Sequence, residues 1–451
     1  MKLILNKLGL LLLPFAVVVM FPVHITVARE LPASGAEREY TLDSCYVLAM
    51  ENYPMIRQYG IIQKLGELSA KDALSAYVPQ INLGGEAAYY SDVVAFPEKI
   101  EDLFSQFAGM DFEGLRNDQY KVALDINQAI WDGGYSGAKK AMAIADAEVS
   151  AMETATELYS LKSRVTEVYF GILTVGAMIE QSDIAAGILK DNEKMLEACV
   201  ANGVAMESDL NVLKAEILAT EQDRIRLAGA KDTYIRLLSL ITGRPMDAST
   251  VFAVPEEKLY KEEYGEDEIH RYELALFDAH ESSLDARRKM INSSVMPSFS
   301  LFAQGYYGYP GMNMFDDMLN YKWGLNGVVG IRFRWNISGL FTRKNHLAQL
   351  EQSSGSLELQ RETFLFNNRL QQVQKNSEIE QMRAIMEQDE QIIGLRTSIR
   401  RASEARLNNG TITANDLVRD IAAETKARLD KSLHRLEYLQ KIYEMKYIVN
   451  D

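Results

Sequence analysis

Residues 161–200 read LKSRVTEVYFGILTVGAMIEQSDIAAGILKDNEKMLEACV, and this stretch decides the fold class. One set of positions in it recurs at alternating spacings of four and three, and all its members except Ser182 and Glu193 are apolar. The set is Leu161, Val165, Val168, Ile172, Val175, Ile179, Ser182, Ala186, Leu189, Glu193, Leu196 and Val200. A heptad pattern sustained over such a length predicts a coiled coil with a left-handed supercoil.

The helix that contains this stretch is expected to be very long. No proline occurs between Gly133 and Val200, which predicts a helix at about 133–200. A helix of about 65 residues spans about 100 Å, which exceeds any single globular core. The heptad spacing continues on a second predicted helix at 206–243.

The second half of the chain has the same arrangement, with long helices predicted at about 338–408 and 412–448. Charged residues on these helices, such as Arg400 and Arg401, are interpreted as solvated surface. The architecture is therefore mostly helical, with long coiled-coil rods.

Four segments alternate between apolar and polar residues, which predicts β-strands. They lie at about 78–91, 119–131, 296–309 and 323–337. The alternation fits a membrane strand with one face toward lipid and one toward water, and it also fits a half-buried strand of a soluble sandwich. Tyrosines and tryptophans near the strand ends favour the membrane strand. Residues 91–117, rich in Gly, Asp and Phe, are predicted to form a loop.

The strands and helices occur in two copies. Pro79 and Pro297 lie at the start of the first strand of each copy, Trp131 and Trp335 close the second strand, and an Asn-Gly pair follows each first long helix. The copies span 40–243 and 269–450, with a linker at 244–268. The predicted fold class is α+β, mostly α, built from a duplicated helix–strand–strand–helix repeat.

Four strands cannot close a β-barrel, and lipid does not tolerate an open strand edge. If these strands lie in a membrane, several chains must share one barrel. Three chains would supply twelve strands, so the membrane interpretation carries a prediction of trimerisation.

The N-terminus has the features of a secretory signal peptide, with a basic start followed by an apolar run. We predict a signal at 1–28, with cleavage after residue 28 or residue 36. A membrane anchor is the alternative, but the run is short and contains Pro14 and Pro22. Lipidation at Cys45 is a further alternative, because residues 42–45 faintly resemble a lipoprotein cleavage box. No other segment is expected to form a membrane helix.

Composition excludes several classes of function. The net charge of -15 argues against a nucleic-acid partner. The five histidines are scattered, and we expect Cys45 and Cys199 to be unpaired. No arrangement of residues suggests catalysis, a metal site or a cofactor, so the chain is predicted not to be an enzyme.

In order, spacing and duplication these segments resemble the TolC family of outer-membrane efflux proteins, over essentially the whole mature chain. Further similarity lies in residues 41–54 and in residues 238–245 (LSLITGRP). The resemblance implies a homotrimer in the cell outer membrane, with a twelve-stranded β-barrel in lipid and a long periplasmic α-barrel. It also implies two partners at the tip of the helices, a periplasmic adaptor protein and an inner-membrane pump. Pro79, Trp131, Pro297 and Trp335 would mark the helix-to-barrel transitions.

The resemblance also implies a gate at the tip of the helical hairpins. Asp416 matches the first of two carboxylates that narrow the entrance in the family, and Arg419 stands at the second. Their partners on the first hairpin fall on Ser208 and Asp209, and Ile412 replaces a family arginine. The hairpin tips that would contact the adaptor are Asn202, Gly203, Leu210, Asn409, Gly410 and Leu417.

These gate residues have plainer interpretations as well. Asp209 and Asp416 each lie near a helix start, where an aspartate often caps the helix. Arg419 could point outward as a solvated residue.

Two other functions are kept open. A structural surface coiled coil would explain the heptads but not the duplicated strands, and a periplasmic enzyme has no supporting residues. The exported cargo could be drugs, metal ions or proteins. The methionines could suit soft metal ions, but Met312, Met314 and Met318 fall in a predicted external loop.

Overall fold

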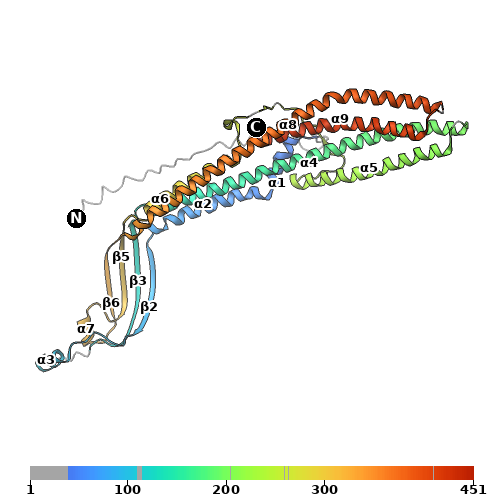
Figure 1. Cartoon of the computed structure of the whole chain (residues 1–451). Coiled ribbons are helices and arrows are strands. Elements are labelled where there is room, and N and C mark those ends of the chain that lie inside the picture. The colour runs from blue at the N-terminus through green and yellow to red at the C-terminus, as the bar shows by residue number, and fades with distance from the viewer. Residues whose placement is uncertain are drawn as a thin grey trace, which may run out of the picture.

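In a computed structural model, a four-stranded sheet and a layer of long helices lie end to end (Figure 1). The structure describes residues 39–108, 114–203, 205–258, 260–262, 264–409 and 411–450. The predicted signal peptide, both its cleavage positions and Gly410 lie outside the described residues. The fold class predicted from the heptads and the alternating strands is confirmed.

The sheet joins the two halves of the chain. Its order is β2 (Gln80–Tyr89), β3 (Asp118–Trp131), β5 (Ser298–Tyr309) and β6 (Gly324–Arg334), and all neighbours are antiparallel. The central pair β3–β5 brings one strand from each half together. Strands β2 and β6 therefore form the two edges.

The strand register separates the side chains into an apolar and a polar face. On one face Ile81 lies opposite Ile126, which lies opposite Ala303, which lies opposite Val329. This face is exposed to solvent in the single chain. Its exposed members include Ile81, Leu83, Leu124, Leu301, Leu325, Val329, Ile331 and Phe333.

The opposite face of the sheet is polar. The Gln304 amide donates to Asp125 Oδ1 at 2.6 Å, and Lys121 Nζ lies 2.6 Å from Glu86 Oε2. The sheet thus has the two-faced character that the period-two alternation predicts.

The helical layer is built from two hairpins. In the first, α4 (Tyr135–Ala201, 67 residues) is followed by α5 (Glu207–Thr242). In the second, α8 (Ser338–Asn408, 71 residues) is followed by α9 (Ala414–Val449). Helix α4 packs between α5 and α9, and α9 packs between α4 and α8, so α5 and α8 lie at the edges of the layer.

Two shorter helices flank the half of the layer that adjoins the sheet. Helix α2 (Gln58–Leu74) packs on α4, and α6 (Tyr272–Ser293) packs on α4 and α8. The remaining short elements are β1 (Glu39–Tyr40), α1 (Leu42–Asn52), η1 (Pro54–Arg57), η2 (Ser75–Tyr77), β4 (Val251–Phe252) and η3 (Glu266–Glu268).

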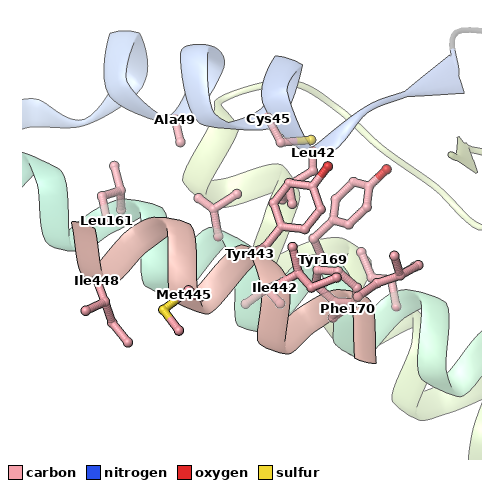
Figure 2. Close-up of a cluster of buried hydrophobic side chains, with 14 of the residues drawn as sticks. Leu42, Cys45, Ala49, Leu161, Tyr169, Phe170, Ile442, Tyr443, Met445 and Ile448 are labelled. Atoms are coloured by element: carbon pink, nitrogen blue, oxygen red, sulfur yellow. The ribbon is translucent and has the colours of Figure 1, made fainter. Parts of the chain in front are cut away.

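The largest apolar core lies in the middle of the rod, where α1, α4, α5 and α9 meet (Figure 2). Cys45, Phe170 and Ile442 are almost completely buried there. The Tyr169 hydroxyl lies 2.7 Å from the carbonyl oxygens of Tyr40 and Ala253, which ties the parallel pair β1–β4 to α4. This core holds β1 and α1, at residues 39–52, against the long helices.

Two sequence expectations need correction. The segment 91–117 was expected to be a loop, but it contains α3 (Glu98–Ala108), and the β5–β6 connection contains α7 (Met314–Leu319). Gly, Asp and Phe suggested a loop, although the apolar spacing within residues 98–108 also suits a helix. Helix α4 also contains one window of mean hydropathy 1.4 that is apolar enough, by length and composition, to cross a membrane, although no segment after the signal peptide was expected to be a candidate membrane helix. Only 22% of that window is buried within the single chain.

Candidate functional site

The two hairpin turns at the tip have matching side-chain caps. Asn202 caps the C-terminus of α4, and its side-chain amide donates to the Ala198 carbonyl at 2.9 Å. Asn409 caps the C-terminus of α8, and its side-chain amide donates to the Ala405 carbonyl at 2.8 Å. Gly203 has φ 74°, a left-handed conformation that glycine adopts without strain. The duplication seen in the sequence therefore reappears in the geometry of the turns.

The return helices begin with equivalent caps. The Met206 backbone N–H donates to Asp209 Oδ2 at 3.4 Å. At the equivalent place the Thr413 backbone N–H and hydroxyl donate to Asp416 Oδ2 at 3.2 and 2.8 Å, and Asp416 N–H donates to Thr413 Oγ1 at 3.3 Å. This is a reciprocal capping box. The interpretation of both aspartates as helix caps is confirmed.

Asp416 has one carboxylate oxygen left for another partner. Its Oδ1 lies 3.6 Å from Arg419 Nη2 on the next turn of α9. The hydrogen bonds from Thr413 lower the pKa of Asp416, and the charge of Arg419 lowers it further, so the group is ionised at neutral pH. The Arg419 side chain is 74% exposed, which leaves its guanidinium free to reach beyond this pair.

The first hairpin contributes less to this site within one chain. Ser208 is exposed and Asp209 is partly exposed. Among the described residues, no hydrogen bond or ion pair links either of them to Asp416 or Arg419. The four residues predicted for the gate lie at the same end of the rod, on the first turn of α5 and the first two turns of α9.

Apolar side chains hold the two hairpins together just behind the tip. Leu417 is fully buried, and Leu210 and Ile412 pack against the cluster that contains it. The buried members are Leu189, Leu196, Leu213, Leu407, Ala414, Leu417 and Ile421. Leu417 was expected at an adaptor-contacting tip, but its side chain faces the other hairpin.

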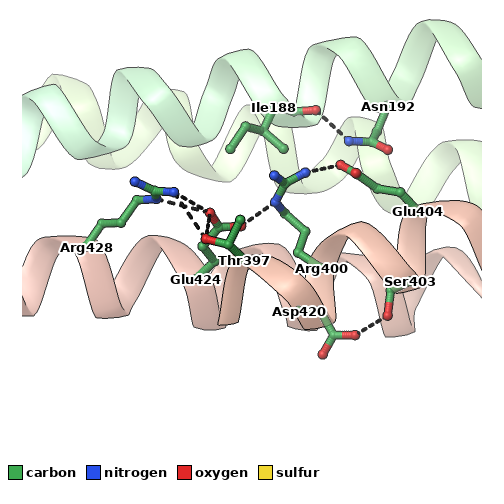
Figure 3. A network of polar contacts seen from close by, with 9 residues as sticks. All are labelled: Ile188, Asn192, Thr397, Arg400, Ser403, Glu404, Asp420, Glu424 and Arg428. Carbon is green, nitrogen blue, oxygen red and sulfur yellow. Dashed lines mark hydrogen bonds and ion pairs between the residues drawn. The ribbon is translucent and has the colours of Figure 1, made fainter. Parts of the chain in front are cut away.

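A buried ion network ties α8 to α9 (Figure 3). Glu424 is 1% exposed, and its carboxylate accepts from the Thr397 hydroxyl at 2.8 Å, from Arg428 Nη2 at 2.7 Å and from Arg400. Burial opposes ionisation of Glu424, but these donors outweigh it and lower its pKa. Arg400 also pairs with Glu404.

The sequence interpretation of Arg400 as solvated surface was wrong, because only 14% of its side chain is exposed. A similar contact lies nearer the tip, where the Ser403 hydroxyl donates to Asp420 Oδ2 at 2.6 Å. Arg400 and Ser403 are three residues apart, which is one step of the four-three heptad spacing. This spacing is typical of positions that face a neighbouring helix. Without the partner helix, that signal cannot be distinguished from a solvated position.

At the other end of α4, side chains fix the passage from strand to helix. Asp132 follows β3 and accepts from the Tyr77 hydroxyl at 2.7 Å and the Ser136 N–H at 2.7 Å. Burial would raise the pKa of Asp132, but these hydrogen bonds lower it. In the second copy, Asn336 Oδ1 accepts from the Gly339 N–H at 3.2 Å.

Aromatic side chains surround the apolar face at this helix-proximal end of the sheet. The Phe299 ring lies 6.0 Å from Trp131 and 5.2 Å from Phe333. Trp335 donates its indole N–H to the Val295 carbonyl at 3.0 Å, close to Pro297 at the start of β5. Pro79 has the equivalent place before β2.

A second aromatic cluster lies at the far end of the same face. The Trp323 ring lies 6.0 Å from Tyr120 and 5.6 Å from Tyr307. Between Phe299 and Tyr307 a strand rises by about 26 Å at roughly 3.3 Å per residue. Strands of an outer-membrane barrel tilt by roughly 35–45°, so this length covers about 20 Å of the apolar band, which is about 25 Å tall between its two aromatic girdles.

The described residues contain no group of three or more His, Cys, Asp or Glu side chains placed to hold a metal ion. Cys45 and Cys199 are both free, as predicted. Burial raises the pKa of the Cys45 thiol to about 11, so it is a packing residue and not a nucleophile.

Comparisons with protein-family models and with curated proteins give no match. Solved structures do match. The outer-membrane channel OprN has a TM-score of 0.67 and 12% identity, over 90% of this chain and 89% of that chain. The outer membrane protein VceC of Vibrio cholerae has a TM-score of 0.65 and 14% identity, over 90% and 95%. The CmeC outer membrane channel of Campylobacter jejuni has a TM-score of 0.64 and 12% identity, over 90% and 85%. The chain therefore has the fold of the TolC-type outer-membrane channels.

Proposed function

We propose that three copies of this chain form a channel through the outer membrane, and that it carries substrates out of the cell from a periplasmic adaptor and an inner-membrane pump. The observation that carries this proposal is the sheet. Its exposed apolar face lies between two aromatic clusters, while its other face is polar. Such a sheet suits lipid on one side and water on the other.

The edges of the sheet support assembly from several copies. Within the described chain β2 and β6 each have only one neighbouring strand, so a row of backbone N–H and C=O groups is left unpaired. In hydrocarbon, each unpaired backbone group has a free-energy cost of roughly several kcal/mol. Pairing β6 of one copy with β2 of the next removes both edges, and three copies close a twelve-stranded barrel.

The helical layer supports the same assembly. Its edge helix α8 exposes apolar side chains at heptad spacing, with Leu359 and Phe366 both 63% exposed and Val373 65% exposed. The opposite edge helix, α5, exposes Leu218 and Ile225. Neighbouring copies would bury these two stripes against each other, so that twelve helical strands surround a periplasmic tunnel.

The tip residues support a gate at the tunnel entrance. In a threefold assembly, Asp416 and Arg419 would recur three times around one axis, with Ser208 and Asp209 on the neighbouring hairpins. The carboxylates would attract cations, and the exposed arginines could pair across the axis and narrow the opening. The channel itself does no chemistry, because the pump supplies the energy.

Single-channel conductance of the purified protein in a planar bilayer tests this proposal. We expect a small, cation-preferring conductance that rises in Arg419→Ala. Asp416→Asn keeps an acceptor for the Thr413 cap while it removes the charge, so it should reduce the cation preference without loss of helix content by circular dichroism. If neither substitution changed the conductance, the proposed gate would be wrong. If no variant formed a channel, the alternative of a structural coiled coil would be favoured.

A further inference from the structure

Helix α3 lies on an arm beyond the far end of the sheet. The β2–β3 hairpin closes where the Leu115 N–H donates to the Val94 carbonyl at 2.9 Å. Phe96 then stacks on Phe315 of α7, with ring centroids 6.0 Å apart and an interplanar angle of 26°. Helix α3 continues outward past α7, on the side of β6 (Figure 1). The arm therefore extends from its own sheet toward the side where the next copy would lie.

One side of α3 is apolar and exposed. Ile100, Leu103 and Phe107 follow helical spacing and are 40%, 55% and 84% exposed. No helix or strand packs along α3 in the part of the chain that the structure describes. An isolated helix of this length is marginal in water, and its apolar area favours burial by about 25 cal/mol per Å². A further surface is needed to cover it.

Lipid does not suit this face. The cluster of Tyr120, Tyr307 and Trp323 marks the outer end of the apolar band of the sheet, and α3 lies beyond that end of the strands. The charged residues of α3 are mostly acidic, with Glu98, Glu101 and Asp102 against the single Lys99. Helices that lie on membrane surfaces instead carry Lys and Arg on their polar side.

We propose that α3 is an intersubunit arm, which packs its apolar side on the external loop of the next copy. This inference rests on the proposed trimer. When β6 pairs with β2 of the neighbour, the segment that follows the neighbouring β2 lies directly beside the arm. That segment exposes Tyr90 and Val94, which are 43% and 54% exposed. Three arms would clasp the external mouth of the barrel, each held at its own base by the Phe96–Phe315 stack.

Disulfide cross-linking of the full-length protein in membranes tests the arm. Cys199→Ser removes the accessible native thiol, since Cys45 is buried. In that background we expect Leu103→Cys with Val94→Cys to give, on oxidation, products of two and three chains that neither single variant gives. The matched pair Glu101→Cys with Val94→Cys, on the acidic side of α3, should give none.

A cross-linked product that migrates as a single chain would mean that α3 folds back on its own base, and it would overturn the arm. Absence of any product would also overturn it. Native mass spectrometry of the same sample distinguishes failure of the arm from failure of the trimer. An assembly of three chains without a cross-link contradicts the arm alone. A species of one chain contradicts the trimer as well. A fluorophore on Leu103→Cys gives an independent readout, because quenching by brominated lipid would assign the apolar side to the membrane.

Discussion

At the scale of single residues, Glu424 makes a buried polar contact between α8 and α9. Its carboxylate is almost fully buried and has three donors, so its removal leaves Arg400 buried without its main partner. Removing one member of a buried ion pair destabilises a protein by about 3–5 kcal/mol.

We therefore expect Glu424→Ala to lower the midpoint of helix unfolding well below wild type, measured by circular dichroism during heating. Glu437→Ala is a matched control on the exposed side of α9. Surface substitutions of that kind stay within about 0.5 kcal/mol. Equal midpoints for the two variants would contradict the structural role of Glu424.

Residue roles could be predicted only in part from the sequence. The capping role of Asp416 could be foreseen, because Thr413 stands three residues before it and the cap is a local interaction. The burial of Arg400 could not, because its partner Glu424 belongs to another helix. Local contacts can be read from spacing along the chain, whereas contacts between helices depend on their packing register.

At the scale of elements, the junction between β3 and α4 depends on the side chain of Asp132. The second copy of the repeat has Asn336 at the equivalent position. Asp132 accepts hydrogen bonds from Tyr77, Gly134 and Ser136, and Asn336 has the equivalent place before α8. The second copy shows that an asparagine can serve this junction.

We expect Asp132→Asn to cost less than Asp132→Ala, because one amide oxygen can still accept from Tyr77 and Gly134 while the Ser136 N–H loses its acceptor. Asp132→Ala should cost about 1 kcal/mol, the usual effect of a lost helix cap. Thermal unfolding of both variants beside wild type measures the difference. If Asn were as damaging as Ala, the carboxylate charge and not the cap would hold the junction.

Strands and long helices could be predicted from the sequence because their periodicities are regular over many residues. Helix α3 was missed because its surrounding loop residues outweighed a short apolar spacing. No helix or strand of the described chain packs along α3, so the usual sign of a packed helix is lacking.

At the scale of the whole molecule, a single chain leaves strand edges unpaired and apolar surfaces exposed. The sheet has two unpaired edges, its apolar face is exposed, and the edge helix α8 exposes an apolar stripe. The α4 window that is apolar enough for a membrane is only 22% buried. The strand edges and the apolar stripes of the helices call for neighbouring copies, which a closed ring supplies, whereas the apolar face of the sheet calls for lipid around that ring.

The central claim is that three copies share one barrel, and the mass of the assembly tests it most directly. Native mass spectrometry of the protein extracted from membranes in mild detergent should give one species of three chains. A species of one chain that stays folded would contradict the account, because the strand edges and apolar stripes would then need some cover other than copies of this chain.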